Sequence, residues 1–210
     1  MTHELYPASD FDHWASSYDQ DVQTGDFPFA GYLQALDTVV KVAEAVPAMQ
    51  VLDVGTGTGN LAVKFAALGC NLWCTDFSAV MLEQARLKLP QARFALHDLR
   101  QDEWPDGFDV EFDRIVSAYV FHHFDLREKI HILQTLSKRL TPDGRLVIAD
   151  IAFATQRALQ ATRDRLADAW EEEEYWLTDE SLAALRQAGF SALFTPVSWC
   201  AGVFCIKREQ

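Results

Sequence analysis

A glycine-rich stretch restricts what this chain can fold into more than any other part of its sequence. An apolar run over residues 49–54 leads into three glycines, Gly55, Gly57 and Gly59, and a helix-favouring segment, 60–68, follows them. Glycine accepts backbone angles that other residues avoid and lets a ligand approach the main chain, so it suits a tight loop between a strand and a helix. The free N–H groups and the dipole of a helix N-terminus favour an anionic group there. The stretch therefore predicts a nucleotide-like ligand at the carboxyl end of the first strand, although three glycines can also mark a plain turn.

The spacing of these glycines separates two kinds of nucleotide-binding loop. A dinucleotide-binding loop reads G-x-G-x-x-G, whereas this chain reads G-x-G-x-G and has Asn60 at the next position. With Asp53 two residues before the first glycine, the pattern D-x-G-x-G-x-G resembles motif I of the class I S-adenosylmethionine (SAM) methyltransferases. That resemblance implies that Gly55, Thr56 and Gly57 pass under the methionine part of SAM. It also implies that Asp53 lies near the SAM amino group.

Strand-like and helix-like segments alternate along the rest of the chain. The predicted elements are strands at 71–76, 92–97, 114–118, 145–151, 190–195 and 198–207, helices at 79–89, 126–140, 154–169 and 178–189, and a turn at 141–144. The last two strands are joined by a short link that permits an antiparallel hairpin but no helical crossover. The methyltransferases that this chain resembles end their sheet with an antiparallel seventh strand, whereas a dinucleotide-binding sheet stays parallel. We therefore predict an α/β fold with a doubly wound, seven-stranded, mostly parallel sheet whose last strand is antiparallel, the Rossmann-like methyltransferase fold.

Residues 1–48 are predicted to form an N-terminal helical cover over a SAM-binding methyltransferase domain of residues 49–210, the two parts making a single domain. Apolar residues at helical spacing predict helices over 10–22 and 30–45. Within the first, the run Phe11-Asp-His-Trp-Ala-Ser-Ser-Tyr-Asp19 resembles the opening of the ubiquinone/menaquinone-biosynthesis methyltransferases and their small bacterial relatives.

This second resemblance concerns the role of the aromatic residues in the first helix. It implies that the helix lies over the SAM pocket and that Tyr18 points into the pocket, toward the methionine end of SAM or the substrate. The same spacing also fits the apolar stripe of a surface helix. We assign Phe11 and Trp14 to such a stripe and leave both interpretations open for Tyr18.

Two further strand ends carry candidate cofactor ligands. Asp76 ends the second strand ~20 residues after the glycine loop, where an acid can accept hydrogen bonds from both ribose hydroxyls. A solvated acid at a strand end is the alternative. The resemblance to the methyltransferases implies that Phe77 packs on the adenine, that Asp98 bonds the adenine amino group, and that the N–H of Leu99 meets a ring nitrogen.

The fourth strand leads into a second informative run, F-D-x-I-V-S-x-x-x-x-H-H, which ends at His123. It resembles motif IV and the following loop of small-molecule methyltransferases. The resemblance implies that Ser117 and Ala118 lie beside the methionine and sulfonium of SAM. It places His122 and His123 near the entrance to the substrate pocket. Because imidazole titrates near neutrality, either histidine is a candidate catalytic base for an acceptor that arrives protonated; the pair can equally shape the loop or hold a tautomer.

Acidic residues in the carboxyl-terminal half leave two roles open. Asp150, near the carboxyl end of the fifth strand, either faces the substrate or is a structural acid. The run Glu171–Glu174, followed by Tyr175, is either a solvated charge run or a pocket wall. In the second interpretation, Tyr175 and one glutamate contact a cationic or polyhydroxy substrate.

Charge and composition limit the partners of this chain. Its 210 residues carry a net charge of −13, and an acidic protein repels nucleic-acid backbones and anionic lipid, so neither is an expected partner. Residues 1–10 contain no apolar signal-peptide core, and no apolar run reaches the length of a membrane span. Four cysteines without C-x-x-C spacing predict buried free thiols in a reduced cytosol. We expect a cytoplasmic protein without a metal site.

These patterns predict an enzyme, a SAM-dependent methyltransferase that transfers a methyl group in line to a small organic molecule. Aromatic candidates for the pocket suit such an acceptor: Tyr18, Phe121, Tyr175, Trp176 and Trp199. Two alternatives stay open. One is a SAM-binding protein without catalysis. The other is an NAD-dependent oxidoreductase, against which Asn60 and the final hairpin argue.

Overall fold

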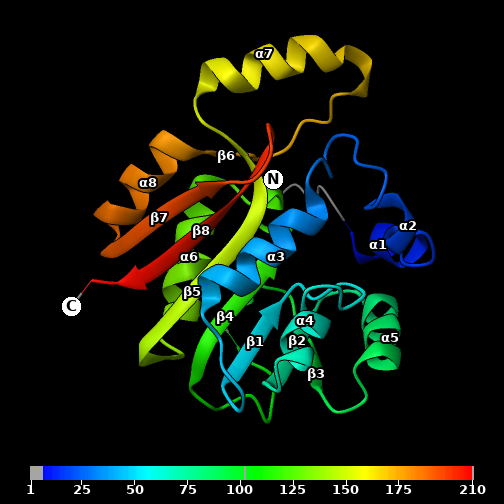
Figure 1. Cartoon of the computed structure of the whole chain (residues 1–210), viewed down its shortest axis with the longest axis vertical. Coiled ribbons are helices and arrows are strands. Elements are labelled where there is room, and N and C mark those ends of the chain that lie inside the picture. Colours follow the sequence, from blue (N-terminus) through cyan, green and yellow to red (C-terminus); the bar gives the residue numbers. More distant parts are fainter. Residues whose placement is uncertain (1–6, 102, 210) are drawn as a thin grey trace.

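A central β-sheet organises the protein, as seen in a computed structural model that describes residues 7–101 and 103–209. Its strands are β1 (Gln50–Val54), β2 (Asn71–Asp76), β3 (Arg93–Leu96), β4 (Phe112–Ala118), β5 (Leu140–Phe153), β7 (Phe190–Pro196) and β8 (Ala201–Arg208). They lie in the order β3-β2-β1-β4-β5-β8-β7 (Figure 1). The first five are parallel, and β8 is antiparallel to both of its neighbours. The predicted sheet with its antiparallel last strand is confirmed, and predictions for residues 1–6 lie outside the described residues.

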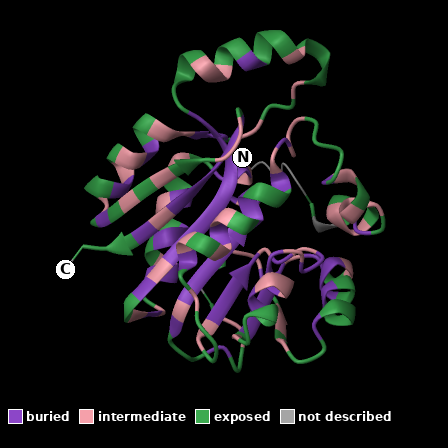
Figure 2. Cartoon of the chain, viewed as in Figure 1, coloured by how far each residue is buried: buried purple, intermediate pink, exposed green. Residues whose placement is uncertain are grey.

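Helices cover both faces of this sheet. They are α3 (Tyr32–Ala43), α4 (Ala62–Ala67), α5 (Ala79–Lys88), α6 (Leu126–Ser137) and α8 (Thr178–Gln187). Helix α7 (Gln156–Leu166) lies beyond the carboxyl edge of the sheet (Figure 1). Helices α3 and α4 pack into one apolar core, and α6 and α8 pack into a second core on the opposite face. Figure 2 shows the buried strands between these exposed outer surfaces. None of the described helices is long and apolar enough to cross a membrane.

The strands are apolar on both faces, which explains their continuous hydrophobic runs. Leu52, Ile115 and Leu146 are neighbours in register on one face of the sheet. Val116 and Val147 pair in the same way on the other face. A parallel sheet that is covered on both sides needs apolar side chains at successive positions rather than at alternate ones. Since β1 to β4 are parallel, their carboxyl ends meet along one edge, where ligands bind in open α/β sheets.

The first predicted helix is wrong in one respect, because the segment 10–22 is broken. It forms α1 (Ala8–Trp14) and the short α2 (Tyr18–Asp21). Trp14 Nε1 and Ser17 Oγ both donate hydrogen bonds to Asp21 Oδ2, at 2.6 and 2.9 Å. These local side-chain bonds hold the chain in a turn between the two helices, in competition with a continuous helix.

Two further differences from the predicted elements concern β5. The predicted turn 141–144 is part of this strand, where it forms a bulge: Phe112 pairs with Leu140, and the next pair joins Arg114 to Arg145. A two-residue strand, β6 (Trp176–Leu177), was not predicted and pairs in parallel with the end of β5. It is too short to show the alternating pattern by which strands are recognised in a sequence.

The N-terminal cover, described here for residues 7–48, is held against the glycine loop and α5 by carboxylates. Asp12 of α1 accepts a hydrogen bond from Ser78 Oγ at 2.6 Å. Asp19 of α2 accepts hydrogen bonds at 2.6, 2.9 and 2.6 Å from the side chains of Thr58, Asn60 and Lys88. Figure 1 shows α1 and α2 beside the end of α5, at the carboxyl edge of the sheet. The acidic amino-terminal segment is therefore attached to the edge at which a ligand is expected.

Candidate functional site

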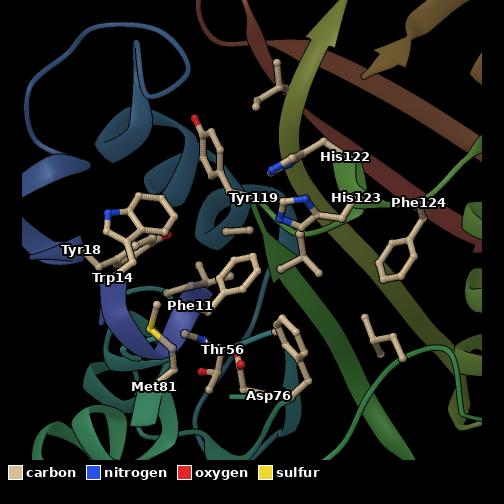
Figure 3. A pocket seen from close by; sticks show the side chains of 18 of the residues that line it. Phe11, Trp14, Tyr18, Thr56, Asp76, Met81, Tyr119, His122, His123 and Phe124 are labelled. Atoms are coloured by element: carbon tan, nitrogen blue, oxygen red, sulfur yellow. Dashed lines mark hydrogen bonds between the residues drawn. The ribbon is translucent and has the colours of Figure 1, made fainter. Parts of the chain in front are cut away.

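A cavity of about 420 Å³ lies at this edge, between the sheet and the cover. In Figure 3, Thr56 and Asp76 lie at its lower end, and Trp14 and Tyr18 face His122 and His123 across it. Its lining includes most of the predicted cofactor-binding residues: Tyr18, Asp53, Gly55, Thr56, Gly57, Asp76, Phe77, Asp98, Leu99 and Ala118. The predicted catalytic candidates His122 and His123 line it as well.

The two loop glycines that line the cavity are needed for different reasons. Both have positive φ, +65° at Gly55 and +54° at Gly57, which disfavours other residues. A Cβ at Gly55 would lie 2.4 Å from Val120 Cγ2, so the loop after β4 approaches its backbone closely. A Cβ at Gly57 would meet no atom of the described residues within 4 Å. The main chain at Gly57 is therefore open to a ligand.

Asp53, at the end of β1, presents an uncompensated carboxylate oxygen. Thr56 Oγ1 donates a hydrogen bond to Asp53 Oδ2 at 2.8 Å, whereas Asp53 Oδ1 is buried with no hydrogen-bond partner in the part of the chain described. Burial raises the pKa of Asp53 to about 7, against the lowering effects of the Thr56 hydrogen bond and of the nearby Ala62 backbone N–H. A buried acid with an unpaired oxygen suits a ligand that brings a positive charge or an N–H donor.

Asp76, at the end of β2, connects the loop to the next helix. Gly57 N–H donates to Asp76 Oδ2 at 2.7 Å, and Ser78 N–H donates to Asp76 Oδ1 at 2.9 Å. Burial raises the pKa of Asp76 to about 6, and these backbone hydrogen bonds oppose the rise. The Ser78 hydroxyl also accepts a hydrogen bond from Met81 N–H, as predicted for a helix N-cap. The carboxylate lies at the cavity wall with its position fixed from two sides.

Three of the aromatic residues expected in the pocket do not line it in the part of the chain described. Phe121 and Trp176 are buried in the second apolar core, and Trp199 is exposed. Of the expected aromatic residues, Tyr18 and Tyr175 do line the cavity.

Three further residues lie differently from their assignment in the sequence. Ser117 is not among the described residues that line the cavity: it is buried, and its hydroxyl donates to the carbonyl of Val54 at 2.8 Å. Phe11 and Trp14 line the cavity, so their assignment to a surface stripe is wrong. The Phe11 ring is 4.9 Å from the Phe77 ring and 5.5 Å from the His123 ring, centroid to centroid. It thus spans the cavity from the cover to the sheet.

His122 is held by a buried carboxylate on β5. Its Nδ1 lies 2.6 Å from Asp150 Oδ1. Asp150 also accepts hydrogen bonds from the Ile151 N–H at 2.9 Å and from Trp176 Nε1 at 3.0 Å. Burial lowers the pKa of His122, but the Asp150 carboxylate outweighs this effect and the net shift is upward. Burial likewise raises the pKa of Asp150, and the charge of His122 reverses the shift, so that this pair stays ionised together.

His123 is paired with a glutamate from the acidic run. Its Nδ1 lies 3.2 Å from Glu173 Oε2, and His122 Nε2 lies 3.4 Å from the same oxygen. The Glu173 side chain is only 8% exposed. Burial and the neighbouring His122 lower the pKa of His123. The two adjacent histidines therefore differ: His122 favours the charged form and His123 the neutral form.

The acidic run divides between the cavity and the surface. Glu171, Glu173 and Tyr175 line the cavity, whereas Glu172 is exposed and forms an ion pair with Arg163. The sequence left two interpretations of the acidic run open, a solvated charge run and a pocket wall. It gave no indication of Tyr119, a cavity residue with a φ of +58°. The signal for the wall was the unusual order of four acids before two aromatic residues. No pattern in the chain separates Glu173 from its neighbours.

The sheet order, the glycine loop and the cavity between sheet and cover define a Rossmann-like methyltransferase domain. A family model described as a methyltransferase domain matches residues 52–146. An uncharacterized methyltransferase of Geobacillus kaustophilus is 36% identical over 197 residues, 88% of each chain. The uncharacterized methyltransferase YrrT of Bacillus subtilis is 32% identical over 207 residues, 93% of each chain. This chain belongs to the class I SAM-dependent methyltransferases.

Solved structures show the same fold. DhpI in a complex named with SAM and HEP superposes with a TM-score of 0.76 at 19% identity, over 99% of each chain. Magnesium protoporphyrin IX methyltransferase from Synechocystis PCC 6803 with bound SAH has a TM-score of 0.72 at 19% identity, over 97% of this chain and 100% of that one. Both cover the N-terminal segment as well as the sheet.

Proposed function

We propose that this enzyme transfers the methyl group of SAM to a small organic acceptor inside the cavity under the N-terminal cover. One observation carries the proposal: a single continuous cavity joins the glycine loop and Asp76 to His122, His123 and an aromatic wall. The first set suits a nucleoside with an amino-acid tail, and the second suits an uncharged or polar organic molecule. The net charge of −13 argues against a nucleic-acid substrate.

The residues of the loop and strand ends fit SAM as the cofactor at the lower end of the cavity. Asp53 Oδ1 is the group for the SAM amino nitrogen, and the open main chain at Gly57 is the surface for its methionine part. Asp76 would accept the ribose hydroxyls, with Phe77 against the adenine. Asp98 and Leu99 line the same end and are assigned to the adenine edge.

The chemistry requires little from the protein beyond placement. The sulfonium of SAM loses its methyl group as a neutral thioether, so the acceptor atom and the S–CH₃ bond must be aligned and water excluded. Phe11 and Trp14 cover the cavity from the N-terminal side, which serves that exclusion. Because the cover and the sheet build one cavity together, we propose that residues 7–48 belong to the same domain as the sheet.

The two histidines are the groups that face the acceptor. If the acceptor arrives protonated, its proton must leave as the new bond to carbon forms. His123, which favours the neutral form, is the base of the pair, and His122, which favours the charged form, orients it and the acceptor. The site therefore selects an acceptor by its size and by its need for a nearby base.

The direct test is methyl transfer from isotopically labelled SAM into a fractionated metabolite extract, read by mass spectrometry. We expect a labelled small molecule with the wild type, a strong loss with Asp76→Ala, and no loss with Asp143→Ala, an exposed acid at the opposite end of β5. SAM binding is measured in parallel by calorimetry.

The outcomes separate the proposal from its rival. A product that depends on Asp76 supports the enzyme and identifies the acceptor. Clear SAM binding with no labelled product from any extract favours a SAM-binding protein without catalysis. A labelled protein or nucleic acid in place of a small molecule would overturn the proposed substrate class.

A further inference from the structure

Three side chains at the upper end of the cavity bring metal-binding atoms together. His122 Nε2 and His123 Nδ1 lie 3.4 and 3.2 Å from Glu173 Oε2. One atom from each residue lies within 4.8 Å of the other two. Figure 3 shows both imidazole rings directed into the cavity, toward Tyr119. Two of these residues come from one short helix, η1 (Phe121–His123), and the third from the segment before β6.

These separations match those between the ligands of one tetrahedral ion. Nitrogen and oxygen ligands bind Zn²⁺ at roughly 2.0–2.2 Å, which places neighbouring ligand atoms on the order of 3.3 Å apart. The two distances to Glu173 Oε2 meet this condition without movement. The two imidazoles need only a modest rotation toward each other, because they already lie 4.1 Å apart, centroid to centroid.

The surroundings of His122 supply the usual support of a metal ligand. Its Nδ1 faces the Asp150 carboxylate at 2.6 Å, and metal-bound histidines commonly donate their second N–H to such a group. Asp150 is itself fixed by Ile151 N–H and Trp176 Nε1. On its other side, His122 Nε2 faces a second carboxylate, Glu173. Without an ion, the Nε2 proton of the charged His122 lies in this 3.4 Å gap, and a bound cation would take the place of that proton.

We propose that His122, His123 and Glu173 form a binding site for one divalent transition-metal ion of the Zn²⁺ type, with its fourth position open to the cavity. Two imidazoles and one carboxylate with an open position are the donor set of catalytic rather than structural zinc sites. The sequence-based expectation of a protein without a metal site is therefore replaced by this proposal. The site stands on the geometry of the three side chains.

A role for the ion in catalysis rests on the proposed function. An acceptor oxygen or sulfur in the fourth position would have its pKa lowered by the cation, would release its proton to water as it binds, and would reach the methyl group already deprotonated. In that case the two imidazoles are ligands, and the ion replaces the base. The acceptor class would then be a hydroxyl or thiol compound rather than an amine.

The test measures metal binding alone, without SAM and without an acceptor. The purified protein is stripped with a chelator and titrated with Zn²⁺ by calorimetry and with Co²⁺ by visible absorption, which reports coordination geometry. We expect one ion per chain in the wild type. Glu173→Gln and His123→Ala should each weaken binding at least about 10-fold, since even supporting partners of metal ligands have effects of this size. Glu172→Gln, next to the site but exposed, should bind like the wild type.

Two results of the metal titration would overturn the proposed site. Absence of saturable binding, or binding that neither Glu173→Gln nor His123→Ala alters, would show that a proton alone joins His122 to Glu173. SAM binding by calorimetry, measured on the same samples, checks that each variant is folded. SAM binding with no metal binding would discard the metal site and leave the proposed methyl transfer intact, so the two failures are distinguishable.

Discussion

At the scale of single residues, the pKa values of the buried carboxylates shift in opposite directions. Burial raises the pKa of Asp53 to about 7 and that of Asp76 to about 6. The pKa of Asp150, equally buried, is lowered because the charge of His122 outweighs burial. The first two acids are costly to ionise until a ligand supplies a partner, whereas Asp150 already has one. Binding energy from the cofactor is thus expected at Asp53 and Asp76.

The raised pKa of Asp53 makes the free energy of unfolding depend on pH. Its folded-state pKa lies above the ordinary value of about 3.9, so its contribution to stability is present below that value and is lost as the pH rises toward about 7. Without cofactor, we expect the free energy of unfolding of Asp53→Asn relative to that of the wild type to rise by about 1–3 kcal/mol from pH 4.5 to pH 7.5. Urea unfolding at both pH values measures this difference. An identical pH dependence of the two proteins would contradict the raised pKa.

The two loop glycines give a second prediction at this scale. Gly55→Ala should lower stability by about 1–3 kcal/mol, because its Cβ would overlap Val120 at a positive φ. Gly57→Ala carries the φ cost alone, about 1 kcal/mol, but its methyl group would project into open space intended for the ligand. It should unfold close to the wild type and bind SAM at least tenfold more weakly. Thermal unfolding and calorimetry separate the two, and tight SAM binding by Gly57→Ala would contradict the assigned role.

The residues of the glycine loop and the strand ends could be predicted from the sequence, whereas contacts between residues far apart in the sequence could not. Asp53, Gly57 and Asp76 follow from local patterns, since a strand, a loop and a helix are continuous in the sequence. The contact of His122 with Asp150 joins residues 28 positions apart, and only the completed sheet brings them together. Glu173 lies between two other glutamates with the same chemistry. Its selection depends on which side of the chain faces the cavity.

At the scale of elements, the N-terminal cover is the part that positions the site without belonging to the sheet. Its first two helices, α1 and α2, are short, whereas apolar spacing predicted one continuous helix over residues 10–22. The bonds of Asp21 to Trp14 and Ser17 end α1 early. This break turns Tyr18 and Asp19 back toward the glycine loop. Strand β6 was missed for a different reason: it has two residues, too few to show an alternating pattern, and it forms by pairing with the end of β5.

Asp19 is the residue through which this arrangement can be tested. It accepts hydrogen bonds from Thr58 and Asn60 and pairs with Lys88 at 2.6 Å. Asp19→Ala should detach α2 from the loop and weaken SAM binding about fivefold, the effect of one net hydrogen bond of about 1 kcal/mol. The exposed Asp26→Ala, in the same cover, is the matched control. Calorimetry reports the affinity, and cleavage within residues 7–30 by a protease should quicken for Asp19→Ala alone. Equal affinity in all three proteins would show that the cover is not held through Asp19.

At the scale of the whole molecule, cofactor binding should connect the cover to the sheet. SAM at about 100 times its dissociation constant stabilises the folded state by about 2.7 kcal/mol. For a chain of this size, that corresponds to a rise in melting temperature of about 5–10 °C. We expect one cooperative transition that shifts as a unit, measured by calorimetry with and without SAM. Two transitions, only one of which moves with SAM, would contradict a single domain.

The whole-molecule architecture was the most predictable level. The alternation of elements and the short link before the last strand together dictate a mostly parallel sheet with one antiparallel member. Volumes and enclosure were not predictable, because the cavity depends on how α1 crosses the sheet edge. The contact of Phe11 with Phe77 and His123 closes that edge, and a surface stripe and a cavity wall look the same in a sequence.

The position of β8 bears on how the chain is assembled during synthesis. Strand β8 follows β7 in the sequence but lies between β5 and β7 in the sheet, and β7 pairs with β8 alone. Among the described strands β7 has no partner in the sheet until residues 201–208 are available to pair with it. The glycine loop and the first five strands can assemble earlier. The β7 edge is therefore the last part of the sheet that can be completed, and until β8 is in place the β5 edge stays unpaired, a condition that favours misassembly.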